Sequence, residues 1–246
     1  MVDRPHRQTD VLEWPRPAST TSSRLRQKIE LITPSFARAC QEVFMHARIR
    51  ELWPEYLITQ HAIIRSTVPL MEAGRARALA IADSDPVAAG VAKYLDVHIH
   101  QETNHDEWLL DDLEVLGIPR KQALARVPSA TVASIAGSQY YWILHYHPVA
   151  LLGYFAFMEG FPPNPQLIRE LRERTGYPEA AFRTFVLHGD LDPGHREELD
   201  RAMDALSLTR DQENVLGLSA MSTGILVSRS LQEVARLPGD WLIKTE

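Results

Sequence analysis

The segment HGDLDPGH, residues 188–195, places two histidines and an aspartate at spacings of four and three residues. Such spacings put the side chains on one face of a helix. A Glu-x-x-His pair lies upstream in HQETNHDEW, and a lone glutamate ends the apolar run VALLGYFAFMEG. The combined set is His188, Asp192, His195, Glu102, His105 and Glu159. Three imidazoles and three carboxylates are the ligand mix expected of two non-haem iron ions.

Each of these elements also has a simpler explanation when it is taken alone. A histidine on an apolar face is more often a hydrogen-bonded core residue than a ligand, and Glu-x-x-His is common by chance. Glu159 by itself would be read as solvated at a helix end. The His-x-x-x-Asp-x-x-His spacing is more specific, because two imidazoles and a carboxylate on consecutive turns are costly to bury without an ion. The combination therefore predicts a metal site.

The elements that must position these residues are helices. Long periodic stretches are separated by Pro and Gly, and strand signals are scarce, which predicts an all-α fold. We expect helices over 22–31, 35–46, 49–80 (bent at Pro54 and Pro69), 85–117 (with Asp85 and Pro86 at its start and Gly117 at its end), 130–160 (kinked at Pro148), 165–175, from 178 onward, and 209–236.

Periodicity places the first pair of candidate ligands in the core. In the 85–117 helix, Glu102 lies on an apolar stripe with Leu95 and Leu109, and His98 and His105 share that face. An unpaired buried polar group costs about 2–7 kcal/mol, and a charged one more. Glu102 must therefore be paired or bound to metal.

The third segment carries helix breakers among its candidate ligands. Pro193 follows Asp192 directly, and Gly189 and Gly194 lie nearby. An aspartate before a proline is typical of a new helix start. We therefore expect a broken helix here, forming the mobile side of the site that becomes ordered when metal binds.

Length and composition favour one domain. The 246 residues are 45% hydrophobic, enough for a full core. We expect a flexible leader over residues 1–20 and a single domain over 21–246. The net charge of −6 argues against nucleic acid or an anionic membrane as partner. Without a membrane-length apolar stretch or a secretion signal, the chain is expected to be cytoplasmic.

Three segments resemble one known family, in order and on successive core helices: HQETNHDEWLLDDLEVLG, GSQYYWILHYHPVALLGYFAFMEG and LHGDLDPGHREEL. They are similar to the haem-oxygenase-like di-iron oxidases, or iron-containing redox enzymes, which are relatives of TenA-type and pyrroloquinoline-quinone-synthase-type proteins. The resemblance covers most of the chain and implies a bundle of about seven core helices. Its six-ligand pattern falls on Glu102, His105, Glu159, His188, Asp192 and His195. Family members differ in the first spacing, which leaves Asp106 or Glu107 as a substitute ligand.

The resemblance also implies an activity. These six residues would hold two Fe(II) ions, with O2 as co-substrate, and would oxidise a small molecule through a peroxo-di-iron intermediate. N-oxygenation, desaturation, carbon–carbon cleavage and decarboxylation are known outcomes in the family, often in secondary metabolism. Near the ligands, Asp106, Glu107 and Asp111 are candidates to orient the imidazoles, although all three could equally lie on a solvated helix face. For Asp111 and Asp112 the solvated position is the expected one.

A carboxylate-bearing substrate is expected, either an amino acid or derivative or a fatty acid. Arg65, within an apolar segment, could clamp a carboxylate with His61 one turn earlier, although a surface position is as plausible for this arginine. Tyr141 and His145 share the Glu159 face and could line a pocket above the metals. His98 is the fifth candidate for this substrate pocket.

Other classes remain open. A metal-free TenA-like hydrolase or small-molecule-binding protein would need a nucleophilic cysteine, and Cys40 is the only thiol, expected to be buried and unreactive. Iron storage would require a cage-forming assembly, and haem degradation would leave six convergent ligands without a role. A homodimer is a further hypothesis.

Overall fold

The structure, a computed structural model, describes residues 19–243, so the predicted leader lies almost wholly outside the described residues. The described residues contain helices and no β-strand, which confirms the all-α prediction. The α-helices are α1 (Thr21–Phe44), α2 (Ile49–Ile64), α3 (Thr67–Ile81), α4 (Pro86–Glu102), α5 (His105–Val115), α6 (Arg120–Leu124), α7 (Ala130–His145), α8 (Ala150–Met158), α9 (Pro165–Thr175), α10 (Arg183–Ala205) and α11 (Arg210–Ala235). Two 3₁₀ turns, Glu179–Phe182 and Gly239–Trp241, complete the set.

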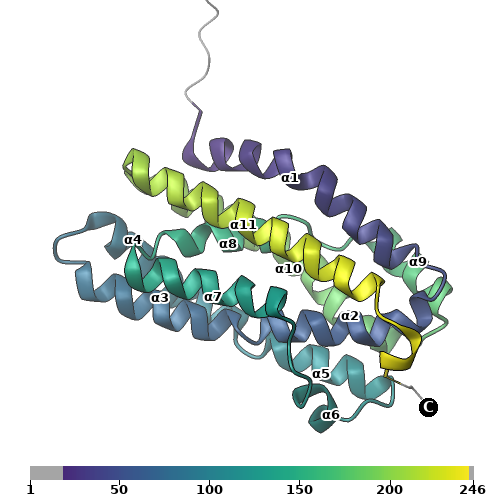
Figure 1. Cartoon of the computed structure of the whole chain (residues 1–246). Coiled ribbons are helices and arrows are strands. Elements are labelled where there is room, and N and C mark those ends of the chain that lie inside the picture. Colours follow the sequence, from purple (N-terminus) through teal and green to yellow (C-terminus); the bar gives the residue numbers. More distant parts are fainter. Residues whose placement is uncertain (1–18, 244–246) are drawn as a thin grey trace, which may run out of the picture.

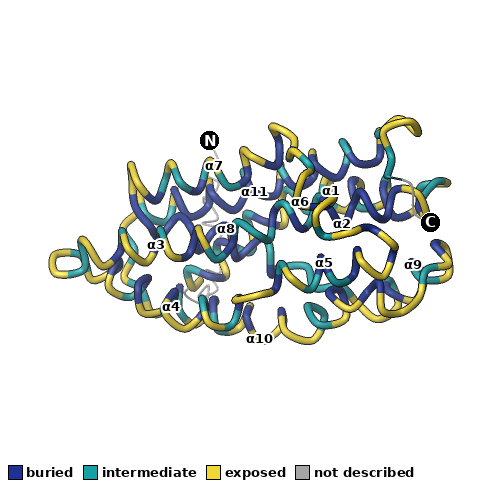
Figure 2. The backbone as a smooth tube through the Cα atoms, turned by 90° about the horizontal axis from the view of Figure 1, so that it is seen from below, coloured by how far each residue is buried: buried dark blue, intermediate teal, exposed yellow. Residues whose placement is uncertain are grey.

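The helices form a bundle around one apolar core (Figure 1). The helix α11 packs against α1 on one side and against α8 and α7 on the other, while α3 pairs with α4 and α2 with α5. Buried residues lie on the inner faces of the helices and exposed residues on the outer ones (Figure 2). Among the described residues, no helix is both long and apolar enough to cross a membrane.

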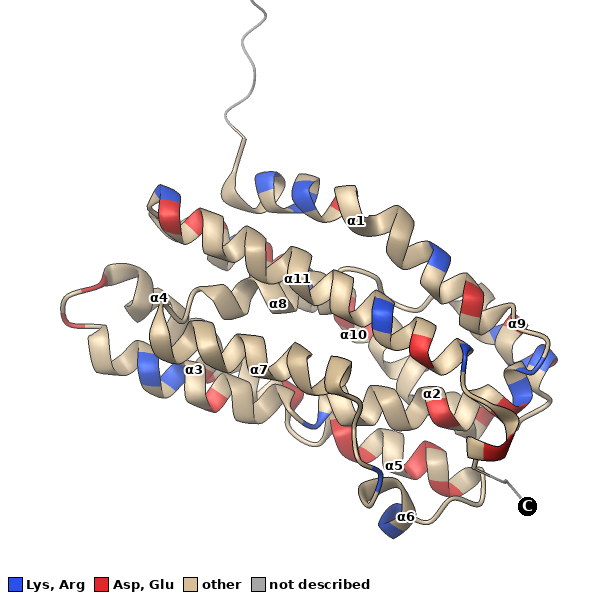
Figure 3. Ribbon diagram, in the orientation of Figure 1, with Lys and Arg blue, Asp and Glu red and all other residues tan. Residues whose placement is uncertain are grey.

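The contact between α8 and α11 is close enough to depend on glycine. A Cβ atom on Gly153 would lie 2.2 Å from the carbonyl oxygen of Leu216, so the two backbones approach directly. Neither α7 nor α8 carries an Asp, Glu, Lys or Arg, as their plain ribbons in Figure 3 show. The helix that leads to Glu159 is therefore apolar throughout and fixed in the core.

Several predicted helix ends are confirmed. Asp85 caps α4, where its carboxylate accepts hydrogen bonds from the backbone N–H groups of Val87 and Ala88. Gly117 ends the α5 segment with φ +78°, a conformation that favours glycine. The long C-terminal helix starts after Thr209 with a capping box.

Other predicted boundaries are wrong. The segments 22–31 and 35–46 form one helix, α1, that continues through Pro34 because it packs along α11. The 49–80 helix divides at 65–66, before Pro69, which has no N–H to bond the carbonyl of Arg65. The 130–160 helix is interrupted at 146–149, around Pro148.

The two ligand-bearing segments differ from the predictions: the one predicted to be continuous is broken, and the one predicted to be broken is continuous. The 85–117 helix is not continuous, since α4 ends at Glu102 and α5 begins at His105 after Asn104 in a left-handed conformation (φ 73°). The predicted break at Pro193 is absent, and α10 continues from Arg183 to Ala205. Phe185 and Leu199, on either side of Pro193, are buried and hold both halves in one helix.

Candidate metal centre

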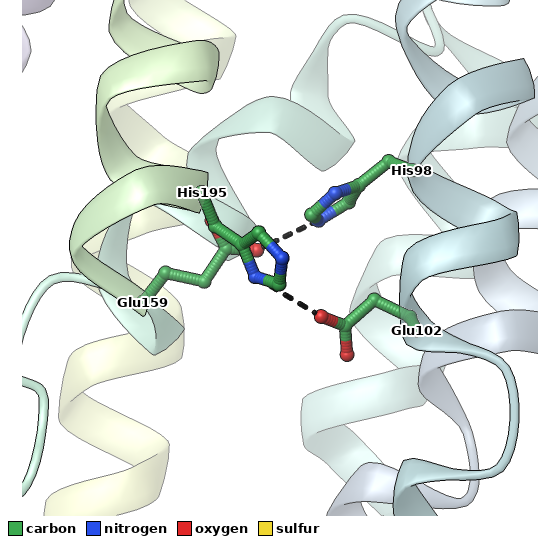
Figure 4. A group of neighbouring side chains, drawn as sticks. All are labelled: His98, Glu102, Glu159 and His195. Atoms are coloured by element: carbon green, nitrogen blue, oxygen red, sulfur yellow. Dashed lines mark hydrogen bonds and ion pairs between the residues drawn. The ribbon is translucent and has the colours of Figure 1, made fainter. Parts of the chain in front are cut away.

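Three parts of the bundle bring the candidate ligands together. The last turn of α4 and the start of α5 supply His98, Glu102 and His105, and Glu159 caps the C-terminus of α8. The middle of α10 supplies the third set, His188, Asp192 and His195. Figure 4 shows His98 and Glu102 extending from one helix toward Glu159 and His195 on the opposite side. Glu102, His105, Glu159, Asp192 and His195 are buried, and His188 is half-buried.

The side chains form two sets with the spacing of metal ligands. The four-residue group is His98, Glu102, Glu159 and His195, and the three-residue group is Glu102, His105 and His188. In each set one ligand atom per residue lies within 4.8 Å of all the others. Five of the six predicted ligands are thus brought together, and His98 joins them.

Glu102 belongs to both groups, and its two oxygens face different imidazoles. Oε1 lies 3.3 Å from Nδ1 of His195, in the four-residue group. Oε2 lies 3.1 Å from Nδ1 of His105, in the three-residue group. A carboxylate in this position can bridge two metal ions.

Burial and pairing set the protonation of the site. Burial lowers the pKa of His188 and of His195, which favours the neutral imidazoles that metal binding requires. Burial opposes ionisation of Glu102, but its pairing with the His105 imidazole outweighs this and lowers the pKa of Glu102. Burial raises the pKa of Glu159. Glu102 is thus the carboxylate held ionised between the two groups.

The donor atoms of the site are better suited to coordinating a metal ion than to hydrogen-bonding one another. Three buried side-chain atoms at the site have no hydrogen-bond partner: His105 Nδ1, His195 Nδ1 and Glu159 Oε2. Within residues 19–243, no Lys or Arg forms an ion pair with Glu102 or Glu159, which pair only with histidines. Buried carboxylates and imidazoles without other partners are a donor set suited to first-row divalent ions such as Fe(II).

A chain of contacts fixes His188 from behind. Its Nδ1 donates to the backbone carbonyl of Thr184, 2.9 Å away, which leaves Nε2 as the nitrogen available to a metal. The Thr184 N–H in turn donates to Asp112 Oδ2, at 3.1 Å. Asp112 is fully buried, so its predicted solvated position is wrong. The residue faces α10 because α5 packs against α10 on this side.

Asp192 occupies a separate position within the site. Its side chain is buried and lines the adjoining cavity, but its oxygens fall in neither close group. Burial, together with the charges of Glu159 and Glu102, raises its pKa to about 8. The predicted role of Asp192 as a metal ligand stays a prediction.

The two predicted substitute ligands, Asp106 and Glu107, belong to neither ligand group. Glu107 is exposed and forms an ion pair with Arg120, away from the centre. His98, predicted to line a substrate pocket, instead belongs to the four-residue group, where its Nε2 lies 2.9 Å from Glu159 Oε1. Its i, i+4 spacing from Glu102 was the sequence signal for this placement.

A cavity of about 610 Å³ adjoins the centre. Glu102, Glu159, His188 and Asp192 lie on its wall, and aromatic and aliphatic side chains form most of the rest. This volume is in the usual range for a small-molecule site. Cys40 also lines the cavity, a position that its distance in sequence from the ligands did not indicate.

The remaining predicted pocket residues do not line this cavity. Tyr141 is 64% exposed and packs on the exposed His145, so the pocket prediction is wrong for both. The reason is that α7 turns Gln139 inward, where it hydrogen-bonds Ser219 of α11. Arg65 is half-buried at the end of α2 and His61 is buried, but neither reaches the cavity wall.

Together, the bundle and its buried His and carboxylate cluster define a haem-oxygenase-like helical protein with a candidate metal centre. The chain belongs to the family described as iron-containing redox enzymes, whose sequence profile matches residues 98–222, just over half of the chain. The matched region contains every candidate ligand.

Solved structures share the fold at low sequence identity. A domain of unknown function with a haem-oxygenase-like fold from Shewanella denitrificans is 16% identical, with a TM-score of 0.75 and coverage of 86% of this chain and 90% of that one. A TenA homologue from Pseudomonas syringae is 12% identical (TM-score 0.64, coverage 93% and 100%). A CADD-like protein of unknown function from Nostoc punctiforme is 18% identical (TM-score 0.61, coverage 87% and 97%). No curated protein matches the chain.

Proposed function

We propose that this chain is a non-haem di-iron, O2-dependent oxidase or oxygenase that acts on a small carboxylate-bearing metabolite. The observation that carries the proposal is the position of Glu102, with one oxygen toward each ligand group. Membership of an iron-containing redox family supports iron as the metal. When bound, iron supplies the electrons that reduce O2.

The chain's own residues would hold, orient and enclose the reacting groups. His98, Glu159 and His195 would bind one ion, His105 and His188 the other, and Glu102 both. Asp192, whose side chain lies on the cavity wall, would hold a proton beside the substrate. The apolar wall of the cavity would exclude water from the reacting groups.

The position of Cys40 keeps a second candidate function open. A thiol on the cavity wall and a TenA homologue among the similar structures favour a metal-free hydrolase or binding protein. Against it, burial raises the pKa of the Cys40 thiol to about 12, so the thiolate that a nucleophile requires is scarce at neutral pH. Replacing Cys40 by Ala would abolish a TenA-like activity and leave iron binding intact.

Anaerobic titration with Fe(II) tests the proposal. We expect about two ions to bind per chain, and the loaded protein to consume O2 on exposure. The variant His188→Ala should bind fewer ions, whereas His100→Ala, an exposed histidine on the same α4 helix as His98, should bind as the wild type does. Failure of the wild type to bind iron, or unchanged binding after His188→Ala, would overturn the proposal.

A further inference from the structure

The cavity beside the centre is elongated. Along α1 it is lined by Phe36, Cys40 and Phe44, and along α2 by Tyr56 and Ile64 with Gln60 between them. In both rows the residues are four apart, so the first and last residue of each row are eight positions apart, or about 12 Å at 1.5 Å per residue. An extended ligand would therefore contact this wall over roughly two helical turns.

The cavity is charged only where it meets the candidate metal centre. No Lys or Arg lines it in the part of the chain that the structure describes. Burial raises the pKa of Cys40 to about 12 and that of Tyr56 well above its usual range, so both side chains are neutral. An ammonium or a second carboxylate held along these walls would lose its hydration without gaining a partner.

The wall reaches the surface at the end away from the core. Met45 and Gln41, near the end of α1, and Asn164, just before α9, line the cavity and are exposed. A ligand can therefore enter between α1 and α9 and extend inward to Glu102 and Asp192. Its leading end would meet the metal ligands, and its body would contact aromatic and aliphatic side chains.

We propose that the substrate is an extended, mainly apolar molecule with a single small polar end at the metal centre, and not a free amino acid. The proposal rests on the proposed function for the identity of the centre, but the apolar part of the cavity exists without metal. Of the expected carboxylate substrates, the proposal favours those with an extended apolar chain, such as fatty acids.

Binding to the metal-free chain tests the apolar part separately from the iron chemistry. Calorimetric titration with alkan-1-ols from hexanol to decanol should give affinities that rise roughly fourfold per added methylene, as burial of each group in an apolar site implies. L-Tyrosine and L-lysine should bind far more weakly than decanol. Affinity independent of chain length, or tyrosine binding more tightly than decanol, would overturn the proposal.

A variant that narrows the cavity locates the binding. Cys40→Phe should weaken decanol binding at least tenfold, and hexanol binding less, because the longer chain needs more of the wall. Arg38→Phe, on an exposed face of the same helix, should leave both unchanged. If circular dichroism shows that Cys40→Phe does not fold, Cys40→Leu should lower decanol affinity in the same direction. Unchanged affinity in a folded Cys40 variant would overturn the proposed location.

The polar end is tested with the iron-loaded chain kept free of O2. Decanoate should then bind more tightly than it binds the metal-free chain, where Glu102, Glu159 and Asp192 line the same wall. Loss of the alkanol binding with normal iron stoichiometry would refute the substrate class alone. Normal alkanol binding without iron uptake would refute the proposed function alone.

Discussion

The two ligand groups share Glu102 but hold their other side chains differently. In the four-residue group the ligands pair with one another, since His98 hydrogen-bonds Glu159 at 2.9 Å. In the three-residue group His105 faces Glu102 at 3.1 Å, and both imidazoles are also held from outside the group. His188 is fixed by the Thr184 carbonyl, and the His105 ring stacks on Trp108 with centroids 3.9 Å apart.

Because of this difference, the free-energy cost of preparing the ligands for a metal ion differs between the two groups. A metal entering the four-residue group must replace the His98–Glu159 hydrogen bond. Burial opposes the charged form of His98, but this bond outweighs it and raises the pKa of His98, so protons compete more strongly with a metal for this imidazole. The three-residue group has fewer ligands, but its imidazoles are already oriented. We therefore expect the first ion to bind there and the larger group to fill second.

Removing the shared residue should have the largest effect. Because Glu102 contributes an oxygen to each group, Glu102→Ala leaves two side chains in the three-residue group and three in the other. One ion should therefore be lost, and the other should bind at least about tenfold more weakly. Anaerobic Fe(II) titration measures the stoichiometry. Glu107→Ala, an exposed acid paired with Arg120, is the matched control and should bind normally. One tightly bound ion in Glu102→Ala would show that the groups do not depend on a common carboxylate.

Single removals from each group should give unequal effects. His105→Ala leaves two side chains in its group, too few to hold an ion, so the stoichiometry should fall from about two to about one. His98→Ala leaves three in the other group, so the stoichiometry should stay near two with affinity lowered at least about tenfold. Both variants are titrated beside His100→Ala. A greater loss in His98→Ala than in His105→Ala would reverse the comparison.

The contacts behind His188 predict a pH effect at Asp112. Burial raises the pKa of Asp112 to about 6, so the native state binds its proton more tightly than the unfolded chain does. Its stabilising contribution is therefore complete below about pH 4 and is lost as pH rises through about 6. Asp112→Asn removes this pH-dependent loss of stability, because an amide does not ionise. The amide oxygen can still accept the hydrogen bond from the Thr184 N–H.

Urea unfolding of the metal-free proteins measures this effect. The free energy of unfolding of Asp112→Asn minus that of the wild type should increase as pH rises from about 4 to about 6. The increase has a limit of about 3 kcal/mol. Asp83→Asn, an exposed position, controls for the general effect of losing a carboxylate. A constant difference between variant and wild type over this range would show that Asp112 does not titrate with folding.

The candidate ligands were easier to predict from the sequence than the cavity beside them. Helical spacing put His188, Asp192 and His195 on one face of a helix. Glu102 and His105 meet His188 although they lie on two separate helices, because the chain turns at Asn104. Spacing also placed His98 on the face of Glu102 but could not distinguish a ligand from a pocket residue. The cavity had no local signal at all, because its wall combines α1, α2, α8 and α11, which are distant in sequence.

The helix breaks show why local signals mislead. Pro193 costs a helix about 3 kcal/mol, yet packing around Phe185 and Leu199 keeps α10 continuous. At the α4–α5 junction no Gly or Pro marks the break. The chain turns there on Asn104, a residue type that tolerates the left-handed region but does not require it.

The junction before His105 gives the smallest predicted effect. Asn104 has φ 73°, and a β-branched residue at this angle is strained by about 1–2 kcal/mol. Asn104→Val should lower the free energy of unfolding by this amount, whereas Asn104→Gly, which adopts the angle freely, should change it by less than about 0.5 kcal/mol. Because the turn positions His105 relative to Glu102, Asn104→Val should also weaken iron binding at the three-residue group first. Full stability of Asn104→Val would instead mean that α4 and α5 can join as one helix, and the separate orientation of His105 would then lose its structural basis.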